Sequence, residues 1–430
     1  MKLTIFPADK GDCLLLQASD GTSALIDGGM PEAYRANVRP FWGGDAPKVL
    51  NLVCVSHIDR DHIGGVLEMM NDVVAWRVHD HRREAGEAET PPDFPRPPSI
   101  EHLWHNSFHA QVGENAGAIE SMLAAAAAHL TNSRVPVLRN LATEYRSIAV
   151  SIPEAIRLSR RVSPEQLDIP LNKKFGGLLA FVRDGQAPIE LSGRFRVRVI
   201  GPFEADLDDL RSKWNRWLRT NRQALTNLEA QEEELEDRLA AAGQPVDEGQ
   251  IGNRKKVTAP NLASLMLYAE VDGHSLLLTG DGHHDDILAG LKHERLLSDA
   301  GHLHVNVLKV QHHGAEHNIS RDFLRRITAD HYVFCGNGQH ENPDERVVQL
   351  LMESRLGTPE QRTGNEEADG PFTVWFNSSS SQEGAVAAHM VKLEELVKEW
   401  QGEGEGDRLH AEFLTEGRQS IELPAALAHA

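Results

Sequence analysis

The chain has 430 residues, 25% of them charged, and a formal net charge of −20, a composition typical of a globular protein with a large core. The acidic balance argues against a protein that coats nucleic acid by neutralising phosphates, although a nuclease stays open because metal ions can supply positive charge locally. Three cysteines exclude a disulfide framework, no apolar run approaches the about 18 residues of a membrane span, and the N-terminal apolar run is too short for a secretory signal, so the sequence predicts a cytoplasmic protein without a membrane partner.

The beginning of the chain has the pattern of short strands separated by Gly and Asp. Apolar runs predict strands at about 3–8, 13–18, 23–27 and 50–56. A helix is expected from Ile63. The intervening segment, Ser56-His57-Ile58-Asp59-Arg60-Asp61-His62, places two imidazoles and two carboxylates within six residues. Such groups repel or desolvate one another unless positive charge lies among them, so the segment predicts ligands of one or two divalent cations at the end of a buried strand.

Insertions are expected between the core strands of the middle region. Five prolines and several charges predict a surface loop at 82–98, within an insertion at about 77–100. A strand is expected at 100–104, directly before His105. Residues 131–175 have a mostly helical and locally basic pattern, which predicts a second insertion over or beside the site.

A long helical pattern interrupts the core near the middle of the chain. Apolar residues recur every three or four positions from Leu207 to Leu239, and Gly243-Gln244-Pro245 ends the pattern. The sequence therefore predicts one long helix, or two, at 205–243 within a helical insertion at 205–255. Its early turns are basic and aromatic and its later turns acidic. The helix packs on the core, pairs with a second copy as a homodimer, or serves as a platform for nucleic acid or a protein partner.

Later strand patterns each lead to a polar group. The strands expected at 262–271 and 275–279 precede Asp281. Those at 305–310 and 332–335 precede His312-His313 and His340, respectively. Histidines 283 and 284 are expected at an exposed helix start. The last predicted elements are a strand at 372–376, an amphipathic helix at 387–400, and a closing hairpin formed by 409–413 and 420–423.

These motifs carry a family resemblance. His57-x-Asp59-x-Asp61-His62-x-Gly64-Gly65 resembles the signature of the metallo-β-lactamase superfamily, usually His-x-His-x-Asp-His, with Asp59 in place of the second His. Five further motifs occur in the order found in the hydrolase domains of ComEC-type DNA-uptake proteins and their stand-alone relatives: Lys10-Gly11-Asp12, Leu25-Ile26-Asp27-Gly28-Gly29, Leu277-Leu278-Thr279-Gly280-Asp281, Val307-Leu308-Lys309-Val310-Gln311-His312-His313-Gly314 and Gly336-Asn337-Gly338-Gln339-His340.

The resemblance implies an α/β (α+β) fold, the four-layer αββα metallo-β-lactamase sandwich. The hydrolase core would comprise residues 1–204 and 256–380, interrupted by the helical insertion at 205–255. Residues 381–430 would form a C-terminal extension of a helix and a β-hairpin.

The resemblance also implies a two-metal site with a metal-bridging hydroxide. The first ion would be held by His57, Asp59 and His105. The second would be held by Asp61, His62 and His313. Asp281 would bridge the two ions, and Asp27 would support the loop by hydrogen bonding.

Several roles stay open on the sequence alone. Asp59 either binds metal or orients His57, and another nearby histidine could replace His105. His313 is favoured over His312 as the ligand, which leaves His312 to support the site or to contact a phosphoryl oxygen. Asp61, His312 and His340 are the candidate catalytic residues, His340 as a substrate contact or a structural loop residue. The carboxylate-rich ligand set admits Zn²⁺ and Mn²⁺, and also Fe²⁺.

Three functions fit these predictions. The favoured one is a two-metal phosphodiesterase or nuclease, whose phosphoester or nucleic-acid substrate could contact basic stretches at 154–161, 211–222 and 254–256. Hydrolysis of a carbon ester, lactone or amide is an alternative, because the same hydroxide attacks carbonyl carbons. The third is an effector or partner-binding subunit of a multi-component system, such as a defence system, with a degenerate metal site.

Overall fold

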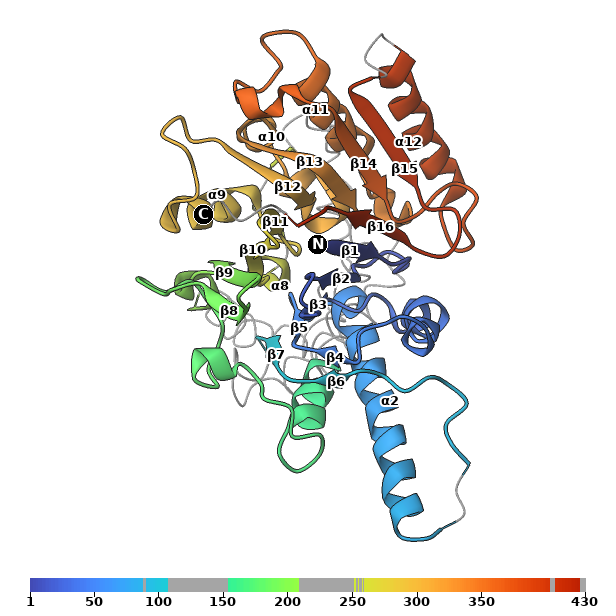
Figure 1. Cartoon of the computed structure of the whole chain (residues 1–430). Helices are drawn as coiled ribbons and strands as arrows, with labels where there is room; N and C mark the ends of the chain where they lie inside the picture. The colour runs from blue at the N-terminus through green and yellow to red at the C-terminus, as the bar shows by residue number, and fades with distance from the viewer. Residues whose placement is uncertain are drawn as a thin grey trace, which may run out of the picture.

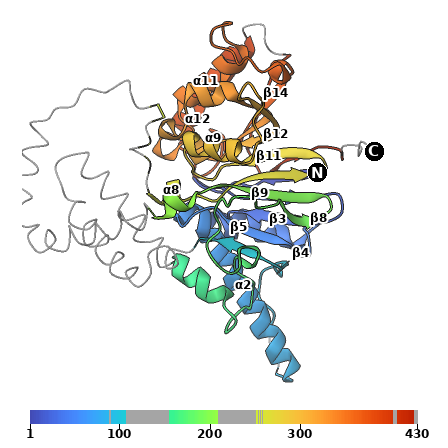
Figure 2. The ribbon, with the colours of Figure 1, turned by 90° about the vertical axis from the view of Figure 1, so that its left-hand side faces the viewer.

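The computed structural model describes residues 1–87, 90–106, 154–208, 251–252, 254, 257, 259–402 and 407–425. Two β-sheets lie face to face, and helices cover the outer face of each (Figures 1 and 2). The expected αββα sandwich and its mixed α/β class are confirmed.

The first sheet is built mainly from the N-terminal part of the chain. In the described chain its strand order is β16-β1-β2-β3-β5-β7. β3 and β5 run parallel, as do β5 and β7, so the C-terminal ends of these three strands meet at one edge. The strands are β1 (Lys2–Ile5), β2 (Leu14–Gln17), β3 (Ser23–Ile26), β5 (Leu52–Val55), β7 (Leu103–His105) and β16 (Gln419–Glu422). A small parallel pair, β4 (Val49–Leu50) and β6 (Ser99–Ile100), lies beside it.

The second sheet combines strands from both expected core segments. Its described strands follow the order β15-β14-β13-β12-β11-β10-β9-β8, and those from β11 to β15 are parallel. The strands are β8 (Ile189–Ser192), β9 (Phe195–Gly201), β10 (Met266–Val271), β11 (His274–Leu278), β12 (Leu303–Lys309), β13 (Ile327–Phe334), β14 (Phe372–Phe376) and β15 (Leu409–Phe413).

Three apolar layers hold the four structural layers together. Successive side chains of a strand point to opposite faces of the sheet and so enter different layers. In β2, for example, Leu14 and Leu16 face the second sheet while Leu15 faces the helix side. The first sheet packs on α2 (Arg60–Glu84), and the second on α9 (His284–His293), α10 (Arg321–Arg326), α11 (Glu345–Leu356) and α12 (Ala387–Trp400). Short helical segments complete the described elements: α1 (Pro31–Ala33), η1 (Tyr34–Val38), η2 (Pro40–Gly43), η4 (Lys173–Phe175), α8 (Ala259–Leu262), η6 (Gln311–Gly314), η7 (Glu316–Asn318), η8 (Gln339–Glu341) and η9 (Glu366–Asp369).

The expected C-terminal hairpin is wrong. β15 pairs in parallel with β14 in the second sheet, whereas β16 pairs antiparallel with β1 in the first. Each strand satisfies its backbone groups at an existing sheet edge, so the connection at 414–418 crosses between the sheets. The two strands of this expected extension, β15 and β16, therefore extend the two sheets of the sandwich instead of forming a separate hairpin.

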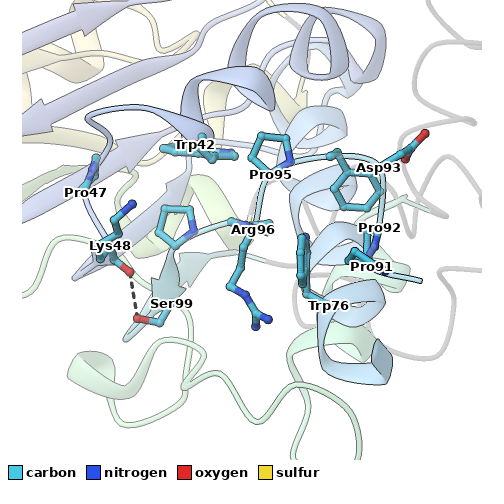
Figure 3. Close-up of a pocket in the computed structure, with 14 residues that line it drawn as sticks. Trp42, Pro47, Lys48, Trp76, Pro91, Pro92, Asp93, Pro95, Arg96 and Ser99 are labelled. Carbon is cyan, nitrogen blue, oxygen red and sulfur yellow. Dashed lines mark hydrogen bonds between the residues drawn. The ribbon is translucent and has the colours of Figure 1, made fainter. Parts of the chain in front are cut away.

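The expected insertion at 77–100 begins as helix, because α2 continues to Glu84. The proline-rich stretch after it lies against Trp42 and Trp76 and borders a hollow of about 840 Å³ (Figure 3). Arg96 stacks over Trp76 at 4.4 Å and bonds Asp80 at 2.6 and 2.7 Å, which fastens the loop to α2. Trp76 lies about 21 Å along the helix from His62, so this hollow is remote from the metal-binding motif.

Two expected insertions are described only in part. Residues 131–153 and most of the helix expected at 205–243 lie outside the described residues. Residues 154–162 are helical, and Ala155, Leu158 and Val162 are buried in the layer beneath the first sheet. None of the described helices is long and apolar enough to cross a membrane.

Candidate metal centre

The His57–His62 segment lies where the first sheet passes into α2. β5 ends at Val55 and α2 begins at Arg60, so His62 is already in the first helical turn. The Gly pair after it permits close packing: a Cβ on Gly65 would lie 1.9 Å from the carbonyl oxygen of Gly28. The motif glycines therefore bring the start of the helix against the loop that follows β3.

Asp281 is the hub of the site. It follows β11 in the second sheet, and its Oδ2 atom faces four imidazole Nε2 atoms. These distances are 3.4 Å to His62, 3.4 Å to His313, 3.7 Å to His57 and 3.7 Å to His312. Two sheets thus contribute to one cluster, and Asp281 and His313 lie within reach of the 57–62 segment, as the sequence requires.

The spacing of these atoms fits a shared metal ion. Distances of 3.4–3.7 Å exceed the usual N–H···O range of about 2.7–3.2 Å. Two ligands of a tetrahedral ion at about 2.0–2.1 Å lie roughly 3.3–3.4 Å apart. Among the described residues, the buried Nε2 atoms of His57, His62 and His313 have no hydrogen-bond partner. Buried polar atoms are rarely left unpaired, so the residues fit a divalent cation between them.

Asp27 fixes the orientation of the first-sheet histidines. One carboxylate oxygen accepts a hydrogen bond from the Ser56 backbone N–H at 2.7 Å. The other lies 2.8 Å from the Ser56 hydroxyl and 2.9 Å from Nδ1 of His62. With its Nδ1 proton directed to Asp27, His62 would offer the Nε2 lone pair to a cation bound beside Asp281. This contact agrees with the supporting role expected for Asp27.

The consecutive histidines after β12 have different surroundings. Both adopt positive φ angles, 46° for His312 and 56° for His313, in a tight turn ending at Gly314. His312 bonds the side-chain oxygen of Asn318 through Nδ1 at 2.6 Å and Asn261 through Nε2 at 3.1 Å. His313 is more deeply buried, and its Nε2 faces Asp281 and also Asp61 at 3.5 Å.

Asp12 belongs to the cluster, although the sequence-based ligand set omitted it. Ligand atoms of Asp12, His62, Asp281 and His313 all lie within 4.8 Å of one another. The buried Lys309 ammonium contacts Asp12, donates to the Gly280 carbonyl at 3.0 Å, and lies 3.7 Å from Asp281. The position of Asp12 in the motif Lys10-Gly11-Asp12 was the available sequence signal for a ligand. A carboxylate before a strand has many structural roles, however, so the motif alone did not mark Asp12 as a ligand.

At four groups of the cluster, burial disfavours the charged form but neighbouring opposite charges favour it more strongly. Burial alone would lower the pKa of His62 and His313, but Asp281 and the other carboxylates raise both well above the usual value. Burial would raise the pKa of Asp281, but the surrounding imidazoles lower it. For Asp12, Lys309 and His313 overcome burial and lower the pKa to about 2. The cluster is therefore a network of mutually stabilised charges.

The other predicted residues surround this cluster. Asp59 lies 3.6 Å from Nε2 of His57. His105 is buried at the end of β7, outside the group around Asp12, and burial together with neighbouring His57 lowers its pKa to about 3. His340 is exposed, and partial desolvation and Lys10 lower its pKa, an effect partly offset by Asp61. The structure thus brings His340 toward the Asp61 side of the site and His105 toward the His57 side.

Part of the chain matches a known protein family. No curated protein matches the chain. A family model described as the metallo-beta-lactamase superfamily matches residues 7–132, a stretch that contains Asp12, Asp27 and the His57–His62 segment. Together with the αββα sandwich and the cluster around Asp281, this similarity to the metallo-beta-lactamase superfamily supports a metal-dependent hydrolase in general terms.

Proposed function

We propose that this chain is a two-metal phosphodiesterase or nuclease. The observation that carries the proposal is the convergence of four imidazole Nε2 atoms on one carboxylate oxygen of Asp281, at 3.4–3.7 Å. Two bound cations would activate water for attack and stabilise the oxygens of an in-line displacement.

The cluster divides into two sets of candidate ligands around Asp281. His57 and Asp59 form one set, with His105 beside them. Asp61, His62 and His313 form the other, and Asp12 is an additional candidate at its inner side. Three aspartates in these sets favour hard or borderline cations, so we expect Mn²⁺, Zn²⁺ or Fe²⁺.

His312 and His340 are proposed to contact the substrate. The side chain of His312 is 26% exposed, compared with 6% for His313, so it is the more accessible of the pair. Its hydrogen bonds to Asn261 and Asn318 fix the ring while leaving it at the edge of the cluster. His340 approaches from the loop after β13, near Lys10.

An anionic phosphoryl substrate is favoured because cations border an otherwise acidic site. Lys10 lies near His340, and Arg60 follows Asp59 directly in the metal-binding segment. These charges would attract a phosphate and offset the carboxylates. A carbon ester or lactone gains little from them, and hydrolysis of such substrates is therefore the second candidate.

The proposal is tested by comparing substrates on metal-loaded protein. We expect hydrolysis of bis-p-nitrophenyl phosphate, little turnover of nitrocefin or simple lactones, and loss of the phosphodiesterase signal in Asp61→Ala. Turnover confined to the acyl substrates would overturn the phosphodiesterase assignment. Activity retained in Asp61→Ala would overturn the assignment of this site.

A further inference from the structure

A basic groove of about 630 Å³ starts beside the metal-binding segment. One side of α2 forms its floor, because Arg60, Gly64, Glu68 and Asn71 recur at helical spacing and all line it. Arg60 stands between Asp59 and Asp61, so one end of the groove adjoins the candidate ligands. From Arg60 to Asn71 the helix rises about 16 Å, enough for several units of an extended polymer.

The walls of the groove are rich in arginine. Arg35 comes from η1 on one side, while Arg157, Arg160 and Arg161 come from the helical residues 154–162 on the other. Five arginines and three glutamates line the groove, an excess of positive charge in a chain whose formal net charge is −20. Such a local reversal marks a surface suited to anions.

The arginines divide into paired and available groups. Arg35 pairs with Glu32 at 2.9 Å and Glu68 at 3.2 Å, and Arg60 pairs with Glu154 at 3.3 Å. Arg157 and Arg160 are exposed, and neither forms an ion pair with another described residue. Three positions apart on one helix, they project from the same face. An incoming anion can engage them without breaking a described ion pair, whereas Arg161 donates hydrogen bonds to Asn71 and Gln166.

We propose that this groove binds the backbone phosphates of a nucleic-acid strand whose scissile phosphodiester lies at the metal centre. The inference rests on the proposed function and extends it to a polymeric substrate. Guanidinium groups match phosphate oxygens in a bidentate manner, and the groove begins at Arg60, next to the candidate ligands Asp59 and Asp61 in the sequence. Among its described lining residues none is aromatic, so the strand would be held by its backbone without base stacking.

The test measures binding with a cleavage-resistant probe. A short fluorescein-labelled single strand with phosphorothioate linkages is titrated with metal-loaded protein at several salt concentrations, and fluorescence anisotropy is recorded. For Arg157→Ala with Arg160→Ala we expect affinity to fall about tenfold. The slope of log affinity against log salt should become shallower by about 1.4, the value for two lost single-strand phosphate contacts. Arg157→Lys with Arg160→Lys should retain most of the slope.

A charge-matched control uses arginines at the other end of the sandwich. Arg194 precedes Phe195, which pairs with Val271 at the end of the second sheet opposite Asp281, and Arg196 follows. Arg194→Ala with Arg196→Ala removes the same charge and should leave affinity and slope unchanged. Equal losses in both double variants would overturn the groove in favour of a general charge effect.

Two other results would also overturn the proposal that the groove binds nucleic acid: no binding by the wild type, or unchanged binding by a folded Arg157→Ala, Arg160→Ala variant. Equal competition by polyglutamate would overturn it as well, because it would indicate that the groove binds an acidic polypeptide. Failure of the wild type to hydrolyse bis-p-nitrophenyl phosphate would instead count against the proposed function, while the anisotropy still decides whether the groove binds nucleic acid.

Discussion

Two pairs of consecutive histidines follow neighbouring parallel strands of the second sheet and have different surroundings. His283-His284 comes shortly after β11, and His312-His313 shortly after β12. His283 accepts a hydrogen bond from the Asp285 backbone N–H at 3.2 Å and lies 3.2 Å from the Gly252 carbonyl. His313 instead directs an unpartnered Nε2 toward Asp281.

His283 and His313 are both buried, so burial alone does not distinguish a candidate metal ligand from a structural histidine. His283 is fully buried, and burial with neighbouring His284 lowers its pKa to about 4. His313 is also buried, but Asp281 and Asp12 raise its pKa. His283 bonds backbone groups at a helix start, and the carboxylate beside its pair, Asp285, is exposed, whereas His313 lies among the buried carboxylates of Asp12 and Asp281. We expect metal and catalysis at the second pair only.

The largest expected effect on stability comes from the cation beneath the His312-His313 pair. Lys309→Met leaves buried Asp12 without its ammonium partner, so the free energy of unfolding should fall by about 3–5 kcal/mol. Urea denaturation measures the change. Lys392→Met, which removes an exposed lysine paired with Glu345 at 3.0 Å, is the control and should cost less than about 1 kcal/mol. Similar small losses in both variants would contradict a charge network built on Lys309.

A direct contrast between the pairs is their effect on hydrolysis. His313→Ala should reduce kcat/KM for bis-p-nitrophenyl phosphate at least about 100-fold, or roughly 2.7 kcal/mol, because a ligand to the metal is removed. His284→Ala, its counterpart in the other pair, should stay within about twofold. Equal losses would mean that the two pairs do not differ in function.

A smaller loss is expected when the supporting carboxylate is changed. Asp27→Asn keeps the backbone at its positive φ of 58°, which Asn tolerates, but weakens the contact with His62. Metal affinity should fall about 10–100-fold, as for other partners of metal-bound histidines. Competition with a metal chelator measures it. Asp285→Asn, beside the other pair, should bind metal as the wild type does, and a comparable loss there would argue against a specific role for Asp27.

The smallest effect concerns the capping role of the first pair. His283→Ala removes the acceptor for the Asp285 N–H and should lower the free energy of unfolding by about 1 kcal/mol. His283→Ser restores an N-cap acceptor and should recover part of that loss. A change in metal content without a change in stability would contradict the structural role.

Strand positions were predictable because each strand has a compact apolar run. β14, β15 and α12 have the bounds that the sequence predicts, and the strands before Asp281 and His312 were also expected. The pairing of the strands was harder to predict from the sequence, since the segments of β15 and β16 have a length and spacing that suit a hairpin. Their partners, β14 and β1, are determined by free sheet edges that a local pattern does not reveal.

The same limit applies to the site. The 57–62 segment could be predicted as a metal-binding segment because its candidate ligands are adjacent in sequence. Asp12 was missed as a member of the cluster because its role depends on Lys309 and His313, which are distant in sequence. The expectation that 283 and 284 are exposed was wrong, since both are buried against the chain near Gly252. Both errors concern residues whose surroundings are formed by segments distant in sequence, which residue type alone does not predict.

Metal content in Asp281→Ala tests the central claim most directly, because Asp281 Oδ2 is the atom on which the histidines of both sheets converge. Plasma mass spectrometry of protein purified with excess Mn²⁺ or Zn²⁺ should find two equivalents per chain in the wild type and at most one in the variant. Wild-type metal content in Asp281→Ala, with loss of metal in His284→Ala instead, would contradict a metal centre between the two sheets.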